Sequence, residues 1–336
     1  MTFRPSPPHP ITTLVLCCTV FGYCSAIAEE RSAEEWLRAM NAAQQELSYA
    51  GTLSYFNGDE LTTLDYRHMV VHGEVHQHVT PLNGPSRKFI REGLSVSLQL
   101  DSDDELVQMQ EKIEAGGIST TFNPKFDKLG ETYNIAVDGY GRIANRSAVC
   151  VSMTPKEQDR YRIHLWIDKQ TSILLRWDMR DHDNRPVSIW QFTEFELIEE
   201  DLRQHSFANG SNFSVTLDIK SKQSVEEHED DEDVQWHLDW VPKGFELSGT
   251  SNQELSLGRD SSHNVMYSDG IVAVSVFVEP APKSHEGVAM ESVSGSTVVV
   301  SHTIQDHRGQ SKLVTVVGDL PKKTVWRIAR GVKFDP

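Results

Sequence analysis

The stretch that decides the fold class is residues 161–197, YRIHLWIDKQTSILLRWDMRDHDNRPVSIWQFTEFEL. Its first apolar side chains fall on every second residue, which is the period of a half-buried strand: Tyr161, Ile163, Leu165 and Ile167. Residues 168–171 and 181–185 have the composition of turns, so the chain is expected to return after each of them as a further strand. Sequential strands joined by short turns predict an antiparallel, meandering sheet rather than a parallel sheet with crossover helices.

A helix and more strands precede this stretch. Ser32 and Glu35 have the spacing of a capping box. The apolar residues after them repeat at helical spacing: Trp36, Leu37, Met40, Ala43 and Leu47. After this helix the pattern changes to period two. Strand-like runs separated by turn pairs such as Asn-Gly and His-Gly are expected at residues 51–56, 61–71, 75–80, 87–91 and 94–100.

An acidic run separates these elements from the last third of the chain. Seven of the eight residues at 226–233 are Asp or Glu, and the polar stretch before them has no clear period. A run of this kind is typical of a solvated linker. Beyond it, strands are expected at residues 234–241, 263–268, 271–278, 297–304 and 312–318.

The chain is expected to finish with a helix that starts near Asp319 as its N-cap, has Pro321 in its first turn and ends at Gly331. Val325, Ile328 and Ala329 are expected to share one face of this helix. A chain of this length exceeds what one hydrophobic core usually organises, so two domains are predicted. The predicted signal peptide, N-terminal domain, acidic linker and C-terminal domain occupy residues 1–28, 29–209, 210–233 and 234–336.

The first residues have the pattern of an exported protein. An apolar stretch at residues 11–23 is followed by Ala-Ile-Ala at 26–28, so cleavage after Ala28 is expected. The stretch is shorter than the about 20 residues that span a bilayer, which disfavours a membrane anchor. Bulky residues precede Cys17 and Cys24, which disfavours a lipid anchor.

The expected cleavage leaves Cys150 as the single cysteine, so no internal disulfide is predicted. Cys150 stands in the β-like apolar run SAVCV at residues 147–151. We therefore interpret it as a small buried side chain rather than a reactive thiol.

The composition and the motifs narrow the class of function. The chain has a formal charge of -17, so it lacks the cluster of basic residues that nucleic-acid binding needs. This charge favours protein partners with basic patches. No nucleophile elbow, phosphate loop, zinc-protease helix or dinucleotide-binding glycine pattern occurs in the sequence. We therefore expect no catalytic residues and no cofactor. A hydrolase stays open as an alternative, because paired carboxylates leave no local signature.

Four histidines raise the question of a metal: His68, His72, His76 and His78. His76 and His78 would project from one face of a strand, which suits a metal. Supporting carboxylate or cysteine ligands are not obvious nearby, so the exposed face of a strand explains these histidines better and no metal is expected. Residues 181–184, DHDN, resemble part of a calcium loop but lack its glycine and distant glutamate, so a hairpin turn is predicted there.

Several longer motifs resemble the RseB/MucB family, periplasmic negative regulators of the sigma-E envelope-stress response. YRIHLWIDKQTSILLRWDM and RPVSIWQFTEFEL look like the family's central hairpin, and YRHMVVHGEVHQHVTPLNGPSRKFIREG is similar to its earlier strands. VPKGFELSG, HNVMYSDGIVAVSVFVEP and LVTVVGDLPKKTVWRIARGV look like its C-terminal domain. The resemblance covers nearly all of the chain after the signal peptide, in the right order.

The resemblance implies a β-rich α+β fold. The N-terminal domain would be a LolA-like unclosed antiparallel β half-barrel with helices, and the C-terminal domain a smaller antiparallel sheet with a helix. The resemblance also implies that the protein binds the periplasmic domain of a transmembrane anti-sigma factor, shields it from proteolysis and is released by lipid-bearing molecules. Whether the chain also forms a homo-oligomer stays open.

An apolar lining for acyl chains is expected on the concave face of the half-barrel, because an open sheet cannot leave such a face wet without cost. The candidate lining residues are Trp36, Leu37, Met40, Leu98, Leu165 and Leu175. The competing interpretation is that the helices simply close the core. A periplasmic lipid or lipoprotein carrier of the LolA kind is the alternative function, but such carriers have one domain, so the unit beyond Val234 favours the regulator.

Overall fold

The structure of the chain is a computed structural model that describes residues 31–83, 87–92, 95–100, 124–198, 215–220, 236–252, 263–281 and 289–334. The predicted signal peptide, with its cleavage point, and the acidic run at 226–233 lie outside the described residues.

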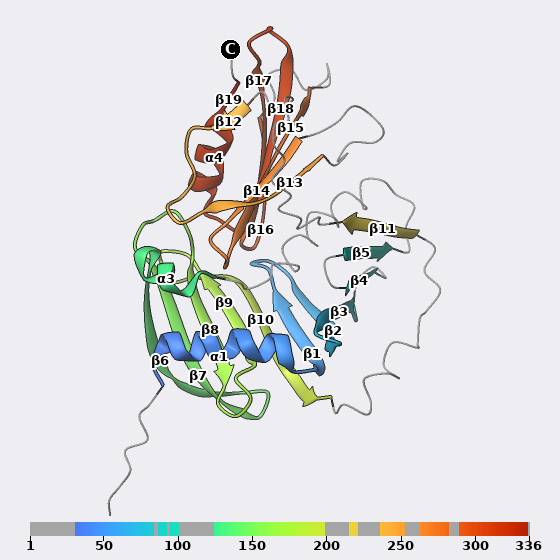
Figure 1. Cartoon of the computed structure of the whole chain (residues 1–336), viewed down its shortest axis with the longest axis vertical. Helices are drawn as coiled ribbons and strands as arrows, with labels where there is room; N and C mark the ends of the chain where they lie inside the picture. Colours follow the sequence, from blue (N-terminus) through green and yellow to red (C-terminus); the bar gives the residue numbers. More distant parts are fainter. Residues whose placement is uncertain are drawn as a thin grey trace, which may run out of the picture. The chain divides into compact units, whose positions relative to one another are not determined.

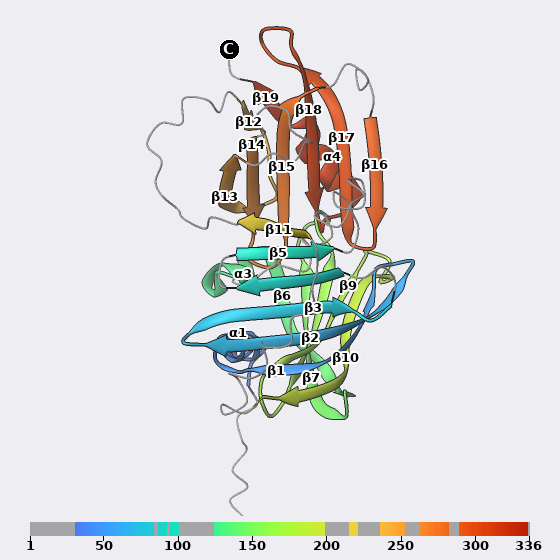
Figure 2. The same ribbon diagram turned by 90° about the vertical axis from the view of Figure 1, so that its right-hand side faces the viewer.

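The N-terminal part of the described chain forms one antiparallel sheet of eleven strands. Their spatial order is β11-β5-β4-β3-β2-β1-β10-β9-β8-β7-β6, so β11 and β6 are its edges and the sheet stays open. Figure 2 shows the run from β11 to β1. The strands are β1 (Tyr49–Phe56), β2 (Leu61–Val71), β3 (Glu74–Pro81), β4 (Arg87–Glu92), β5 (Ser95–Leu100), β6 (Tyr133–Ile143), β7 (Arg146–Pro155), β8 (Arg162–Asp168), β9 (Leu174–Arg180), β10 (Pro186–Leu197) and β11 (Val215–Lys220).

Helix α1 (Ala33–Glu46) lies across this sheet (Figure 1) and contacts β6 and β7. The predicted capping box is confirmed: the Glu35 N–H donates to Ser32 Oγ at 3.2 Å, and the Ser32 N–H donates to Glu35 Oε2 at 2.7 Å. These two bonds satisfy backbone donors that a helix start leaves without partners. The face that α1 turns to the sheet is apolar and buried.

The middle of the sheet is buried on both faces. Four successive residues of β7, from Ala148 to Val151, are buried, although neighbouring side chains in a strand point to opposite faces. On one side, Trp166 lies against Gly141, where an added Cβ would come within 2.5 Å of the indole. Short helix α3 (Phe126–Thr132) packs against β6 and buries Leu129.

The C-terminal part forms a second antiparallel sheet in the order β13-β14-β15-β18-β17-β16. Its strands are β13 (Glu246–Asn252), β14 (His263–Ser268), β15 (Ala273–Pro280), β16 (Ala289–Ser294), β17 (Thr297–Gln305) and β18 (Ser311–Gly318). Helix α4 (Lys322–Arg330) contacts β17 and β18 and buries Val325, Ile328 and Ala329, as the sequence predicted. A separate pair, β12 (Trp236–Leu238) and β19 (Val332–Phe334), joins the two ends of this part.

The β-rich α+β architecture is therefore confirmed, with two corrections in detail. Asp319 is not the N-cap of α4, because Pro321 occupies that position. Instead, Asp319 accepts hydrogen bonds from the hydroxyls of Ser296 and Thr297 at 2.9 and 2.7 Å. In addition, β11 falls within the segment predicted as a linker and pairs with β5. Within the described ranges, α1, α3 and α4 are too short and too polar for membrane-spanning segments.

Candidate functional site

Four of the six predicted lipid-lining residues lie in one buried apolar cluster that includes the inner face of α1. Leu37, Met40 and Leu165 are 0% exposed and Trp36 is 6% exposed, and all four belong to one apolar cluster. Leu175, also 0% exposed, belongs to a neighbouring cluster with Ala43 and Phe192. The side chain of Leu98, on β5, lies outside the described residues. The fold thus brings Trp36, Leu37, Met40 and Leu165 together. A lipid site formed by all six candidate residues stays a prediction.

Of the histidines on β2 and β3, His68 packs into the sheet, whereas His76 and His78 are half-buried. His68 is buried, its Nε2 lies 2.7 Å from the Gln44 carbonyl oxygen, and its ring stacks on Tyr49 at 4.6 Å. Gln77 Nε2 lies 3.1 Å from His68 Nδ1. No group of three metal-ligating side chains occurs in the part of the chain that the structure describes.

The segment that resembles a calcium loop is the turn between β9 and β10. The Arg185 N–H donates to Asp181 Oδ1, and the Asn184 N–H donates to the Asp181 carbonyl. Burial acts to raise the pKa of Asp181, but the hydrogen bonds from Arg185 outweigh it and hold the pKa below its ordinary value. A turn closed by its own side chains accounts for this sequence.

Cys150 is buried in β7, where burial raises the pKa of its thiol to about 12. A thiol with that pKa is protonated at neutral pH, and the thiolate is the nucleophilic form. The interpretation of Cys150 as a packed side chain therefore agrees with its surroundings.

A buried ion pair joins the N-terminal sheet to the C-terminal one. Arg160, just before β8, donates from Nη1 to Asp269 Oδ2 at 2.6 Å, and both side chains are 3% exposed. Tyr133, at the start of β6, donates its hydroxyl to the same oxygen at 2.7 Å. Arg160 also donates to the Lys243 carbonyl at 2.6 Å. One guanidinium thus connects residues from both parts of the chain.

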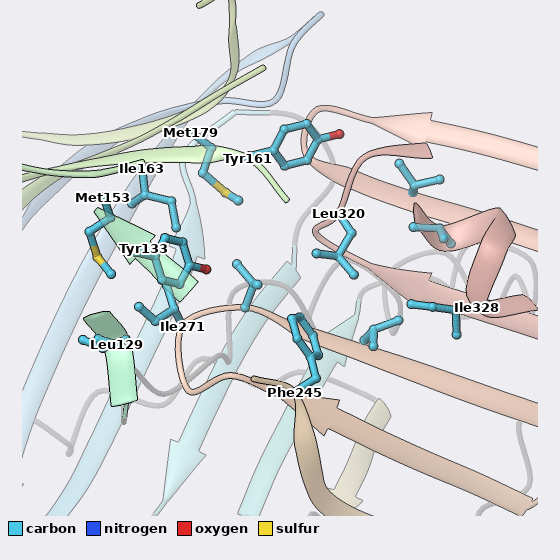
Figure 3. Packing of buried hydrophobic residues seen from close by; sticks show 14 of the residues in the cluster. Leu129, Tyr133, Met153, Tyr161, Ile163, Met179, Phe245, Ile271, Leu320 and Ile328 are labelled. Carbon is cyan, nitrogen blue, oxygen red and sulfur yellow. The ribbon is translucent and has the colours of Figure 1, made fainter. Parts of the chain in front are cut away.

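Aromatic and apolar side chains enclose this ion pair. The Arg160 guanidinium lies 5.4 Å from the ring centroid of Tyr133 and 5.0 Å from that of Phe245. Figure 3 shows Tyr133, Phe245 and Ile271 around this region. Burial raises the pKa of the Tyr133 hydroxyl well above its ordinary value, and the charge of Asp269 raises it further. Tyr133 therefore stays a hydrogen-bond donor at neutral pH.

Two further sets of polar contacts join the N-terminal and C-terminal parts of the chain. Glu246 of β13 pairs with Lys125 and, at 3.0 Å, with Lys128. On another side, Asn57 Nδ2 donates to Ser294 Oγ at 3.2 Å. Among the described residues, side chains far apart in sequence therefore link the N-terminal and C-terminal parts of the chain, and the sequence predicted none of these contacts.

An open pocket of about 430 Å³ lies beside the ion pair. Its wall combines the loop at residues 157–159 with Trp240, Lys243, Lys323 and Arg327. Such a mixture of charged and aromatic side chains can bind a charged group, and none of these residues was a candidate from the sequence.

Comparison with known proteins gives the family of the chain. Residues 32–211 match the model of the MucB/RseB N-terminal domain, and residues 230–333 match that of the MucB/RseB C-terminal domain. The sigma factor AlgU regulatory protein MucB of Pseudomonas aeruginosa is 27% identical over 303 residues, which cover 90% of each chain. The sigma-E factor regulatory protein RseB of Haemophilus influenzae is 27% identical over 310 residues, covering 92% of this chain and 93% of that protein.

Solved structures agree with this match. A crystal structure of MucB in complex with MucA(peri) has a TM-score of 0.67 and 25% identity, covering 90% of this chain and 99% of that one. The complex of Pseudomonas aeruginosa MucA and MucB has a TM-score of 0.68 and 24% identity, with the same coverage.

Proposed function

This chain belongs to the MucB/RseB family, and we propose that it is a periplasmic regulator that binds the periplasmic segment of a transmembrane anti-sigma-E factor. Binding shields that segment from the protease that starts the stress response. The relatives are regulatory proteins by name rather than enzymes, as we expected of this chain.

The observation that carries the proposal is the match of both domains in one chain. The two family models follow each other along residues 32–333, and MucB, which is similar over 90% of this chain, has been crystallised with MucA(peri). A carrier that uses the N-terminal sheet alone would not need the second matched domain. The regulator is therefore favoured over the lipid carrier.

Both domains take part in binding in this proposal. An unfolded segment loses conformational entropy when it binds, and two tethered surfaces raise the effective concentration at which it is held. The contacts around Arg160 keep the two sheets together, which supports a continuous binding surface. The sequence predicts a hinge between the domains at residues 221–233, which lie outside the described residues.

Release by a lipid signal is the finer part of the proposal. Acyl chains would enter beneath α1 and displace packing at Trp36, Leu37, Met40 and Leu165, with Leu98 and Leu175 as further candidates. Lipid A or an acylated peptide, titrated against the purified protein, should change tryptophan fluorescence and weaken segment binding. Unchanged binding at saturating lipid would contradict release by this route.

Export is proposed on the sequence pattern, with cleavage after Ala28 and no lipid anchor on the protein itself. Mass spectrometry of the protein purified from the periplasm should give a chain beginning at Glu29. A chain that begins earlier, or one that carries a diacylglyceryl group, would refute this expectation.

The binding proposal is tested with the full mature chain and the periplasmic segment of the anti-sigma factor from the same organism. Isothermal titration should give one segment bound per subunit. Absence of binding at micromolar concentrations would remove the regulatory assignment. Light scattering of the same samples would give the oligomeric state of the free and bound protein.

A further inference from the structure

The exposed face of α4 is basic, although the whole chain carries a formal charge of -17. The helix has four cationic side chains in nine residues, and all four are exposed. Two of them lie over indole rings: Arg327 at 3.7 Å from the Trp240 centroid, and Arg330 at 5.0 Å from the Trp326 centroid. Stacking on an indole holds a guanidinium plane in place while its N–H edge stays available to a ligand.

Arg327 belongs to the pocket beside Arg160, and Arg330 does not. Lys323, one turn before Arg327 on α4, and Lys243 complete the cationic wall of this pocket. Within the described residues, Lys323 and Arg327 form no ion pair, and Lys243 reaches only Glu131 at 3.9 Å, with both side chains more than 60% exposed. Three cations thus line the same pocket as Trp240, and among the described residues none of them has an ion pair shorter than 3.9 Å.

The opposite wall of the pocket is acidic. Glu157 and Asp159 come from the loop between β7 and β8. Asp159 is neutralised by Arg160 at 2.9 Å, whereas Glu157 has no ion pair in the part of the chain that the structure describes. A compact dianion such as phosphate would be repelled by this wall. A group that presents a carboxylate to one side and a cation to the other matches both walls.

We infer that this pocket, lined by Lys243, Lys323, Arg327, Trp240 and Glu157, docks a polypeptide segment in which an acidic residue stands close to a basic one. Trp and Arg are the residue types that dominate binding energy at protein interfaces, which favours a protein occupant. The inference deepens the proposed function and rests on it, because the occupant is the anti-sigma segment. The pocket has walls from both domains, so one docked residue pair would contact both.

Binding of the labelled anti-sigma segment to the full mature chain tests this inference by fluorescence anisotropy. Lys323→Glu and Arg327→Glu should each weaken binding roughly tenfold, because each places a negative charge beside the docked carboxylate. Lys323→Arg keeps the charge and should bind like the parent protein. Arg330→Glu is the matched control, since it reverses a stacked arginine on the same helix outside the pocket.

A double-mutant cycle identifies the docked residue. Each acidic residue of the segment is replaced by alanine and measured against the parent protein and the Arg327→Glu protein. One replacement should weaken binding to the parent protein and have little effect on the Arg327→Glu protein. Equal unfolding midpoints for all variants, measured in parallel, would show that these differences arise from binding and not from folding.

The outcomes separate the inference from the proposed function. If the parent protein binds and the pocket variants bind equally well, or if no acidic residue couples to Arg327, the pocket inference is overturned and the regulatory function stands. If inorganic phosphate binds the parent protein but not the Lys323→Glu protein, the pocket is a phosphate site, which also overturns the inference. If the parent protein does not bind the segment, both fall together.

Discussion

Two buried regions of this molecule are held together in different ways: the layer beneath α1 and the cluster where Arg160 meets Asp269. Beneath α1, Leu37, Met40 and Leu165 are fully buried in an apolar cluster. At Arg160, a pair of opposite charges is enclosed, with each side chain only 3% exposed. Apolar packing stabilises in proportion to the area removed from water, whereas a buried ion pair depends on both partners being present. The comparison indicates that the first region supplies stability and the second fixes how the two sheets meet.

The largest expected effect is at the ion pair. Asp269→Ala leaves the buried Arg160 with Asp159 but without its second carboxylate partner, and it removes the acceptor for the N–H groups of Ile271 and Val272. The free energy of unfolding should fall by about 3–5 kcal/mol in urea titrations. Tyr133→Phe removes only one hydroxyl from the same cluster and should cost about 1 kcal/mol. Equal effects of the two substitutions would mean that the ion pair does not hold the junction.

The apolar layer is tested at Leu37. Leu37→Ala removes a fully buried side chain and leaves a cavity against the sheet, so it should destabilise by about 2–5 kcal/mol. Gln45→Ala, on the exposed side of α1, should change the stability by less than about 0.5 kcal/mol. If Leu37→Ala is as mild as Gln45→Ala, α1 does not close the core.

Asp168 is a second buried carboxylate, and its partners Arg146 and Thr171 are 22 and 3 residues away in the chain. It accepts from Arg146 at 2.9 Å and from the Thr171 hydroxyl at 2.7 Å. Burial acts to raise its pKa, yet these bonds outweigh burial and lower the pKa below its ordinary value. A carboxyl whose pKa is lower in the folded state stabilises the fold above its unfolded pKa, near 4, and this contribution is lost as the pH falls through the folded pKa.

Asp168→Asn should therefore destabilise by about 1.5–3 kcal/mol at neutral pH, the range for a hydrogen bond to a charged group. The difference between Asp168→Asn and the parent protein should shrink as the pH falls below about 4, because the parent carboxyl then becomes protonated. Urea titrations at several pH values measure this. A difference that does not change with pH would show that the charge of Asp168 has no role.

The smallest effect is expected at the start of α1. Ser32→Ala removes the hydroxyl that accepts from the Glu35 N–H, which should cost about 1 kcal/mol. Glu35→Gln keeps a side-chain acceptor for the Ser32 N–H and should cost less. A larger loss for Glu35→Gln would contradict the capping-box account.

The apolar layer could be predicted from the sequence, because local periodicity determines it. The helical spacing of Trp36, Leu37 and Met40 and the alternation at Leu165 identify one buried face each. The sequence does not predict strand β16, because nearly all of its side chains are exposed and no apolar period marks it. Asp319 was assigned to the wrong role because its partners, Ser296 and Thr297, come from the preceding β16–β17 turn.

The junction could not be predicted, because its partners are far apart in the chain. Arg160 and Asp269 are 109 residues apart, and each stands in a segment with the composition of a turn. A charged residue in a turn is usually solvated, so nothing local indicates a buried pair. The pocket lined by Arg327 depends on the same meeting of distant segments.

The central claim is that this chain protects an anti-sigma segment by binding it. The most direct test is the rate at which the protease that starts the stress response cleaves that segment, with and without the full mature chain at saturating concentration. Cleavage should slow at least tenfold with the parent protein, and at concentrations near the dissociation constant of the parent protein Arg327→Glu should protect the segment less. If the cleavage rate stays unchanged when the parent protein has bound all of the segment, the proposed protection is wrong.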